Sequence, residues 1–208
     1  MLDPQLLHSI GEAPDLDTLT ARVVKAVHEM GFGLVSGALV HGRLGSAGGL
    51  VKSFGNPPEA YLQSATSLTD GLRDPVLGQI LARPGVVKYD QSTYVEAGSA
   101  DLWDLQAAFG YRCGVTISHH APGHGEVFFL GVDGPDRLPE NPVAALRLHA
   151  SLRLLALQAQ QCVERITRPA VIEVASSEWA GAIREGALSY AVRGGLVKIE
   201  ELRRALNP

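Results

Sequence analysis

Long hydrophobic runs, paired cysteines and an excess of basic residues are all missing from this sequence of 208 residues. No apolar run approaches the roughly 20 residues that a membrane-spanning helix needs. The N-terminal segment is acidic and lacks the basic flank and the small-residue cleavage site of a signal peptide. We therefore expect a cytoplasmic protein that does not interact with a membrane.

The two cysteines, Cys113 and Cys162, lie far apart in the sequence and form no Cys-x-x-Cys pair. This spacing favours two reduced, buried thiols over a disulfide framework or a zinc site. The formal net charge of −4 and the isoelectric point near 6.0 argue against a surface built to bind the phosphates of nucleic acids.

Catalytic signatures are also absent from the sequence. It contains no Gly-rich phosphate loop, no Gly-x-Ser-x-Gly nucleophile elbow and no His-Glu-x-x-His pattern. Hydrolytic chemistry would need an activated nucleophile or water, and neither cysteine stands in a nucleophile signature. We expect a protein that is not an enzyme and that holds no cofactor.

One histidine-rich segment could suggest a metal site, because His119, His120, His124 and Glu126 lie close together in the sequence. Neighbouring residues on a strand point to opposite faces of a sheet, so His119 and His120 would not serve one metal ion. We interpret the segment as a solvated hairpin loop, with a specific metal site as the alternative.

The apolar fraction of 46% and the charged fraction of 19% are typical of a soluble globular domain. Hydrophobic periodicity and turn residues divide the chain into helices and strands. The expected helices are 16–30, 58–69, 75–82, 101–110 and 141–166, and the expected strands are 32–40, 50–54, 86–90, 111–120 and 126–134. This order predicts an α/β fold: an α–β–α sandwich with a central antiparallel sheet, similar to GAF and PAS domains.

The helix expected over 141–166 has an unusually broad apolar face, with leucines on both sides of its main stripe. A helix that is apolar over so wide an angle is expected to be buried on two sides. We expect one side to pack on the sheet and the other to contact a partner in a dimer. The predicted dimerisation residues are Leu148, Leu152, Leu155, Ala159 and Cys162.

Four short motifs follow one another along the chain. They are the segment from Asn56-Pro57-Pro58 to Tyr61, then Asp74-Pro75, then Tyr89, and finally Phe109-Gly110 followed by Gly114. Their order and spacing resemble the autoinducer-binding domain of LuxR-type quorum-sensing receptors. In that family an Asn-x-Pro-x-x-Trp segment, an Asp-Pro, a second Trp and a Phe-Gly-x-x-x-Gly strand recur at these distances. The resemblance covers roughly residues 16–166.

The resemblance implies a site for a small acylated lactone, enclosed between the sheet and the helices on one face. Asp74 matches the carboxylate that accepts a hydrogen bond from the ligand amide. Tyr61 stands where the family has the Trp that donates to the lactone carbonyl, and Tyr89 where a second Trp packs on the ring. Asp74 also precedes Pro75 as a helix-capping residue would, and the two roles can coexist.

Two positions depart from the family pattern. Pro57 replaces a tyrosine that contacts the acyl carbonyl, and Ala65 replaces an aromatic residue. We therefore expect a pocket that is larger and less polar, or one shaped for another ligand, so that the signal is an acyl-homoserine lactone or a related molecule. Further wall residues implied by the resemblance are Leu77, Leu102, Trp103, Tyr111, Thr116 and Phe129. For each of them, ordinary core packing is the alternative.

Residues 167–208 are expected to form a helical tail, separate from a sensor domain over 1–166. The run from Arg184 to Gly194 resembles the opening of the helix-turn-helix domain that follows the sensor in LuxR-type receptors. The sequence ends at Pro208, before any recognition helix. Because base reading in the major groove requires that helix, we expect no DNA binding by this chain alone.

These observations predict a LuxR-type protein that binds a small acylated signal and acts through protein contacts. It would form a homodimer, or a heterodimer with a full-length receptor that it inhibits, because a dimer with one reading head binds a palindromic operator poorly. The alternative is a ligand-independent interaction module that kept the fold and lost the pocket.

Overall fold

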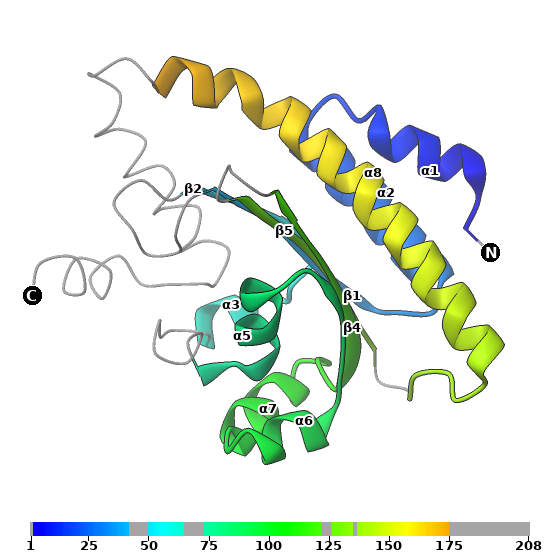
Figure 1. Cartoon of the computed structure of the whole chain (residues 1–208), viewed down its shortest axis with the longest axis vertical. Helices are drawn as coiled ribbons and strands as arrows, with labels where there is room; N and C mark the ends of the chain where they lie inside the picture. Colours follow the sequence, from blue (N-terminus) through cyan, green and yellow to red (C-terminus); the bar gives the residue numbers. More distant parts are fainter. Residues whose placement is uncertain (1, 42–49, 65–72, 122–125, 135–136, 175–208) are drawn as a thin grey trace, which may run out of the picture.

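The computed structural model describes residues 2–41, 50–64, 73–121, 126–134 and 137–174. Two layers of helices enclose a five-stranded sheet (Figure 1). The strands are β1 (Leu34–His41), β2 (Leu50–Gly55), β3 (Gly85–Tyr89), β4 (Cys113–Ala121) and β5 (Glu126–Gly134). The helices are α1 (Pro4–Gly11), α2 (Leu16–Glu29), α3 (Glu59–Ser64), α5 (Pro75–Ala82), α6 (Gln91–Glu96), α7 (Ala100–Ala107) and α8 (Pro142–Val174).

The sheet is antiparallel throughout, in the order β2-β1-β5-β4-β3. Helices α1, α2 and α8 lie on one side of it, and α3, α5, α6 and α7 lie on the other (Figure 1). The predicted α–β–α sandwich with a central antiparallel sheet is therefore confirmed. Helices α1 and α6 were not predicted, because both are short and their apolar residues are too few to establish a period.

Helix α2 shows how local sequence sets the first layer. The Asp15 side chain accepts a hydrogen bond from the Thr18 backbone N–H at 2.7 Å, which caps the helix start. At the other end, Gly31 has a φ of 90° that favours glycine. Leu19, Val23 and Val27 are fully buried, so the predicted apolar stripe packs on the sheet.

The two faces of the sheet differ in character, because successive side chains on a strand point to opposite faces. On β5, Phe128, Leu130 and Val132 join the main hydrophobic core with α1, α2 and α8. The alternate β5 residues, Phe129 and Asp133 among them, face a cavity on the other side. The strand register therefore separates a dry core from a hollow face.

Helix α8 requires a correction to the predicted dimer contact. Leu152 is 1% exposed, and Leu155, Ala159 and Cys162 are fully buried in the core beside α1 and α2, so the domain itself occupies this stripe. The prediction that they contact a partner is wrong for these four side chains, and Leu148 is partly buried against the same core. The sequence signal was misassigned because α1, which covers part of this face, was not anticipated.

The same helix extends beyond its predicted end, to Val174 rather than residue 166, so it crosses the predicted boundary between sensor and tail. The division into 1–166 and 167–208 stays a prediction, and the expected tail helices lie outside the described residues. Cys113 and Cys162 are both buried, as predicted. In the described part of the chain, no helix is long and apolar enough to cross a membrane.

A candidate ligand cavity

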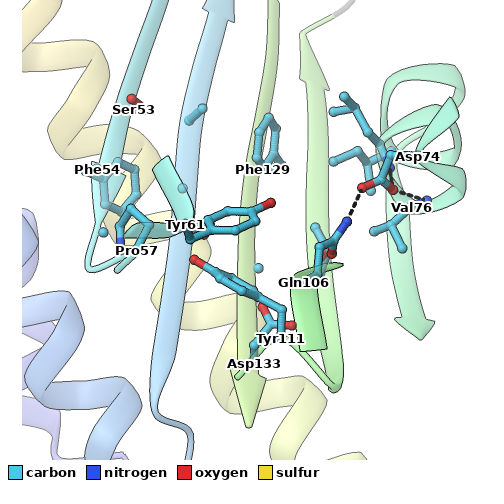
Figure 2. Close-up of a pocket in the computed structure, with 18 of the residues that line it drawn as sticks. Ser53, Phe54, Pro57, Tyr61, Asp74, Val76, Gln106, Tyr111, Phe129 and Asp133 are labelled. Atoms are coloured by element: carbon cyan, nitrogen blue, oxygen red, sulfur yellow. Dashed lines mark hydrogen bonds between the residues drawn. The ribbon is translucent and has the colours of Figure 1, made fainter. Parts of the chain in front are cut away.

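A cavity of about 430 Å³ lies on the face of the sheet that α3 and α5 cover (Figure 2). Its volume falls within the range of about 300–1,000 Å³ that is typical of small-molecule sites. The structure brings together eight of the predicted ligand residues along this cavity: Pro57, Tyr61, Asp74, Leu77, Tyr89, Tyr111, Thr116 and Phe129.

Three other predicted residues do not line this cavity in the described structure. Leu102 is buried in a separate cluster with Val76, Tyr89 and Tyr94, and Trp103 packs against that cluster while its indole N–H donates to the Arg112 carbonyl at 3.1 Å. In the described structure both therefore pack behind residues of the cavity wall, and their role as ligand residues stays a prediction. Ala65 lies outside the described residues.

Asp74 both caps a helix and lines the cavity. Its Oδ1 accepts hydrogen bonds from the backbone N–H groups of Val76 at 2.8 Å and Leu77 at 3.1 Å, at the start of α5. Among the described residues, its Oδ2 receives only long contacts, from Gln106 Nε2 at 3.4 Å and the Tyr94 hydroxyl at 3.4 Å. Oδ2 thus retains capacity for a donor at ordinary hydrogen-bond distance.

Burial raises the pKa of the Asp74 carboxyl above its ordinary value, while the hydrogen bonds from Leu77 and Val76 oppose this rise. Tyr94 and Gln106, which the sequence did not reveal as site residues, also bind each other, with the Tyr94 hydroxyl 3.3 Å from Gln106 Oε1. A carboxylate held by one helix start and two flanking side chains keeps a fixed direction.

A second buried carboxylate, Asp133, lies in the same cavity. Its Oδ1 accepts a hydrogen bond from the Tyr89 hydroxyl at 2.6 Å. In the strand register, Tyr89 on β3 pairs with Gly114 on β4, and Gly114 pairs with Asp133 on β5. The tyrosine therefore reaches across one intervening strand. A Cβ at Gly114 would lie only 2.4 Å from the Tyr89 hydroxyl oxygen, so the glycine leaves room for this crossing.

Asp133 is 2% exposed, and burial raises its pKa to about 7. The hydrogen bond from Tyr89 lowers the pKa, and the negative charge of Asp74 raises it. Asp133 was missed in the sequence, although it follows the predicted wall residue Phe129 by four positions on the same strand. The period of two along a strand places both side chains on one face and could have found it.

Tyr61 and Tyr111 form an aromatic part of the cavity wall. The rings of Tyr61 and Tyr111 lie 4.7 Å apart between centroids (Figure 2). Burial raises the pKa of Tyr61 above its ordinary value and that of Tyr111 to about 12, so both hydroxyls are neutral donors at physiological pH. The Ser36 side chain lies near enough to the Tyr111 hydroxyl to lower its pKa, but among the described residues no group meets hydrogen-bond geometry with this buried hydroxyl.

The Asn56-Pro57 segment is held against the start of β1 by hydrogen bonds of Asn56 to the backbone. Asn56 Oδ1 accepts from the Val35 backbone N–H at 2.8 Å, and its Nδ2 donates to the Gly33 carbonyl at 3.0 Å. The preceding Gly55 has a φ of 140°, and a Cβ there would lie 2.1 Å from the Val35 carbonyl oxygen. The motif is therefore a backbone clamp, which places Pro57 and Tyr61 at the cavity.

His119 and His120 point to opposite faces, as predicted. His119 Nδ1 lies 2.8 Å from Gln160 Oε1 on α8, and His120 Nε2 lies 2.7 Å from the Ile80 carbonyl oxygen on α5. Both are partly buried and tie helices to the sheet, so their interpretation as solvated loop residues is wrong; His124 lies outside the described residues. Within the described ranges, no three His, Cys, Asp or Glu side chains cluster as metal ligands.

A sheet with a dry helical face, and a second face that encloses a mainly apolar cavity with a few buried polar groups, is typical of an α–β–α domain that binds a small molecule. A family model described as the autoinducer binding domain matches residues 15–163. The chain belongs to this family, whose members are the signal-binding domains of LuxR-type receptors. No curated protein matches the sequence.

Solved structures share this fold. CepR2 from Burkholderia cenocepacia, an N-acylhomoserine-lactone-dependent LuxR-family transcription factor, is 20% identical with a TM-score of 0.63, over 80% of this chain and 98% of that one. SdiA in complex with octanoyl-rac-glycerol is 19% identical with a TM-score of 0.62, over 78% of this chain and 65% of that one. Escherichia coli SdiA in another structure is 16% identical with a TM-score of 0.60, over 92% and 96%.

Proposed function

We propose that this chain is a quorum-sensing receptor domain that binds a small acylated signal, an acyl-homoserine lactone or a related molecule, in the cavity beside Asp74. The observation that carries this proposal is the direction of Asp74: Oδ1 accepts two backbone hydrogen bonds at the start of α5, whereas in the described part of the chain Oδ2 has only contacts of 3.4 Å. An amide N–H of a ligand would be a stronger partner for this oxygen than the two side chains now near it.

Tyr61 and Tyr111 supply the hydrogen-bond donors that are missing at Pro57. Proline has no side-chain donor, but the Tyr111 hydroxyl is buried at the cavity without a partner among the described residues. We infer that Tyr111, with Tyr61 beside it, donates to the carbonyl groups of the ligand. The apolar side chains of Leu77, Ile80 and Phe129 would then cover the acyl chain. This division of labour matches a pocket that is mainly apolar with few placed polar groups.

The family and its structural neighbours support a signal-binding role rather than a catalytic one. CepR2 is described as dependent on N-acylhomoserine lactone, and SdiA has been solved with an acylglycerol bound. Both ligands combine a polar head with an acyl chain. We extend this shared chemistry to the present cavity and place the protein in the cytoplasm, where such receptors meet diffusible signals.

Thermal unfolding with a series of N-acyl-homoserine lactones of varied chain length tests the proposal. A ligand present at about 100 times its Kd stabilises the folded state by roughly 2.7 kcal/mol, which for a chain of this size raises the Tm by about 5–10 °C. Asp74→Asn is the matched variant, because asparagine also caps helices but presents an amide donor to the cavity. An equal rise in this variant, or no rise with any lactone, would contradict the proposal.

A second function, pairing with another LuxR-type chain, is favoured by the outer face of α8. Four large apolar side chains are exposed there: Val143 at 57%, Leu146 at 68%, Leu154 at 51% and Leu157 at 43%. Exposed apolar side chains gathered on one element are typical of an interaction surface. We propose that this outer face, and not the buried stripe, contacts a second copy of the chain or a full-length receptor. Formation of a heterodimer would inhibit the full-length receptor.

Sedimentation of the purified protein tests the pairing. The double substitution of Leu146 and Leu154 to glutamate should convert a dimer to a monomer without unfolding the domain, since both side chains are exposed. Val95→Glu is the matched control, because Val95 is also an exposed apolar residue at 55% but lies on α6, across the sheet (Figure 1). A wild-type monomer that also fails to associate with a full-length receptor would contradict the proposal.

A further inference from the structure

We propose that Asp133 is a second ligand anchor, and that the cavity selects an uncharged acylated ligand carrying a hydroxyl group that donates a hydrogen bond to this carboxylate. The inference rests on the proposed signal-binding function and adds the chemical class of the preferred signal. The family resemblance assigns ligand contacts to Asp74 and to the aromatic positions, but it assigns none to Asp133.

The first argument is the unfilled capacity of the Asp133 side chain. The carboxylate lines the cavity and is 2% exposed. Oδ1 accepts from Tyr89 at 2.6 Å, and among the described residues no group donates to Oδ2. A carboxylate has sites for about four hydrogen bonds, so the bond from Tyr89 leaves this side chain with room for a further donor. A hydroxyl group brought by a ligand could supply that donor.

The second argument is the charge of the cavity wall. The described lining includes the carboxylates of Asp74 and Asp133 and, from α2, the exposed acid Asp17, and none of the described lining residues is a lysine, arginine or histidine. The lining also contains the Tyr111 hydroxyl, which is buried and has no partner in the described structure. The described part of the wall therefore offers carboxylate acceptors and neutral hydroxyls, and it holds no cation that would bind an anionic ligand.

These two features discriminate between ligand groups at Asp133. An ionised carboxylate accepts hydrogen bonds and donates none, so a ligand hydroxyl is attracted to it and a ligand carbonyl oxygen is repelled. A carboxylate on the ligand, such as that of a ring-opened lactone, would add a third buried negative charge beside two others and be rejected. The hydroxyl can belong to the acyl arm or to the head group of the ligand.

Binding measured by calorimetry with four eight-carbon probes tests the inference and separates the two sources. N-(3-hydroxyoctanoyl)-homoserine lactone carries the hydroxyl on the arm, and 1-octanoyl-rac-glycerol carries hydroxyls on the head. N-(3-oxooctanoyl)- and N-octanoyl-homoserine lactone have no hydroxyl. At about pH 8, where Asp133 is mostly ionised, we expect at least one hydroxyl probe to bind about tenfold or more tightly than both probes without one.

Asp133→Asn sharpens the test, because asparagine can still accept from Tyr89 but turns an amide donor toward the ligand. We expect the ratio of Kd values between the 3-oxo and 3-hydroxy lactones to fall by about tenfold or more in this variant. Asp104→Asn removes a carboxylate from the exposed surface of α7 and should leave the ratio unchanged. If Asp133→Asn fails to fold, Asp133→Ser provides a smaller side chain for the same comparison.

The outcomes separate this inference from the proposed function. If N-octanoyl-homoserine lactone binds and depends on Asp74, but no hydroxyl probe binds more tightly, the hydroxyl inference is overturned and signal binding stands. A hydroxyl preference that Asp133→Asn leaves intact also overturns it. If none of the four probes binds, both proposals fail together.

Discussion

The Tyr89 hydroxyl crosses the intervening strand β4 to donate to Asp133 at 2.6 Å, and Gly114 lies directly beneath the tyrosine ring on that strand. This row of three residues joins β3, β4 and β5 at the cavity. It gives a physical reason for the second glycine of the Phe-Gly-x-x-x-Gly motif, whose first glycine, Gly110, has a φ of 101°.

Gly114→Ala should destabilise the fold by about 1–3 kcal/mol. The added Cβ would lie 2.4 Å from the Tyr89 hydroxyl oxygen and 2.5 Å from the Val132 carbonyl oxygen, and the latter is backbone that cannot easily yield. Urea unfolding measures the change. Gly78→Ala on α5 is the control: its Cβ would meet nothing within 4 Å, and the substitution should stabilise the helix by about 0.5–1 kcal/mol. Equal effects at both glycines would contradict the packing argument.

Asp133 should make stability depend on pH. Its folded-state pKa of about 7 lies above the ordinary value of 3.8, so the folded state binds more protons than the unfolded state between these values. The free energy of unfolding should therefore fall as pH rises from about 4 to about 7, by on the order of 1.4 kcal/mol for each unit of pKa difference. Asp133→Asn should flatten this part of the profile. A variant whose profile keeps the wild-type slope would show that Asp133 does not titrate in this range.

Asp74→Ala and Asp74→Asn should differ in stability although both remove the charge. Alanine leaves the Val76 and Leu77 backbone N–H groups without the cap, at a cost of about 1 kcal/mol. Asparagine can still accept these bonds, so its effect on unfolding should be smaller. Chemical denaturation of the ligand-free protein gives the comparison, and a larger loss for asparagine than for alanine would contradict the capping role.

Leu155→Ala and Leu154→Ala test which side of α8 belongs to the core. Leu155 is fully buried, and its truncation should cost about 2–5 kcal/mol. Leu154 is 51% exposed, and the same truncation should change the stability of a monomer by no more than about 0.5 kcal/mol. Denaturation at low protein concentration isolates the fold from any dimer contact. Similar losses at the two leucines would mean that the outer side of α8 is also packed within the domain.

The strands and most helices could be predicted from the sequence, because their periodicity and turn residues are local signals. The order of strands in the sheet and the position of α1 depend on contacts between distant segments. This is why the apolar stripe of α8 could be found but its partner could not: Leu155 is apolar whether it meets α1 and α2 or a second protein.

The cavity was predictable only in part for a similar reason. The resemblance predicted Asp74, Tyr61 and Tyr89 as site residues, because each stands at a position that contacts the ligand in the family. Tyr94 and Gln106 come from short helices whose orientation depends on the packing of α6 and α7, so no sequence pattern points them at Asp74. Asp133 was missed, although strand alternation along the predicted strand 126–134 would have placed it on the same face as Phe129.

Strand β5 is the partition between the two halves of the domain. Phe129 and Asp133 line the cavity. On the opposite face, Phe128 and Leu130 pack in one hydrophobic core with Leu152 and Leu155 of α8. Whatever occupies the cavity is therefore separated from the longest helix by the thickness of one polypeptide backbone. We therefore expect any shift of β5 caused by a bound molecule to be transmitted to α8 directly through these packing contacts.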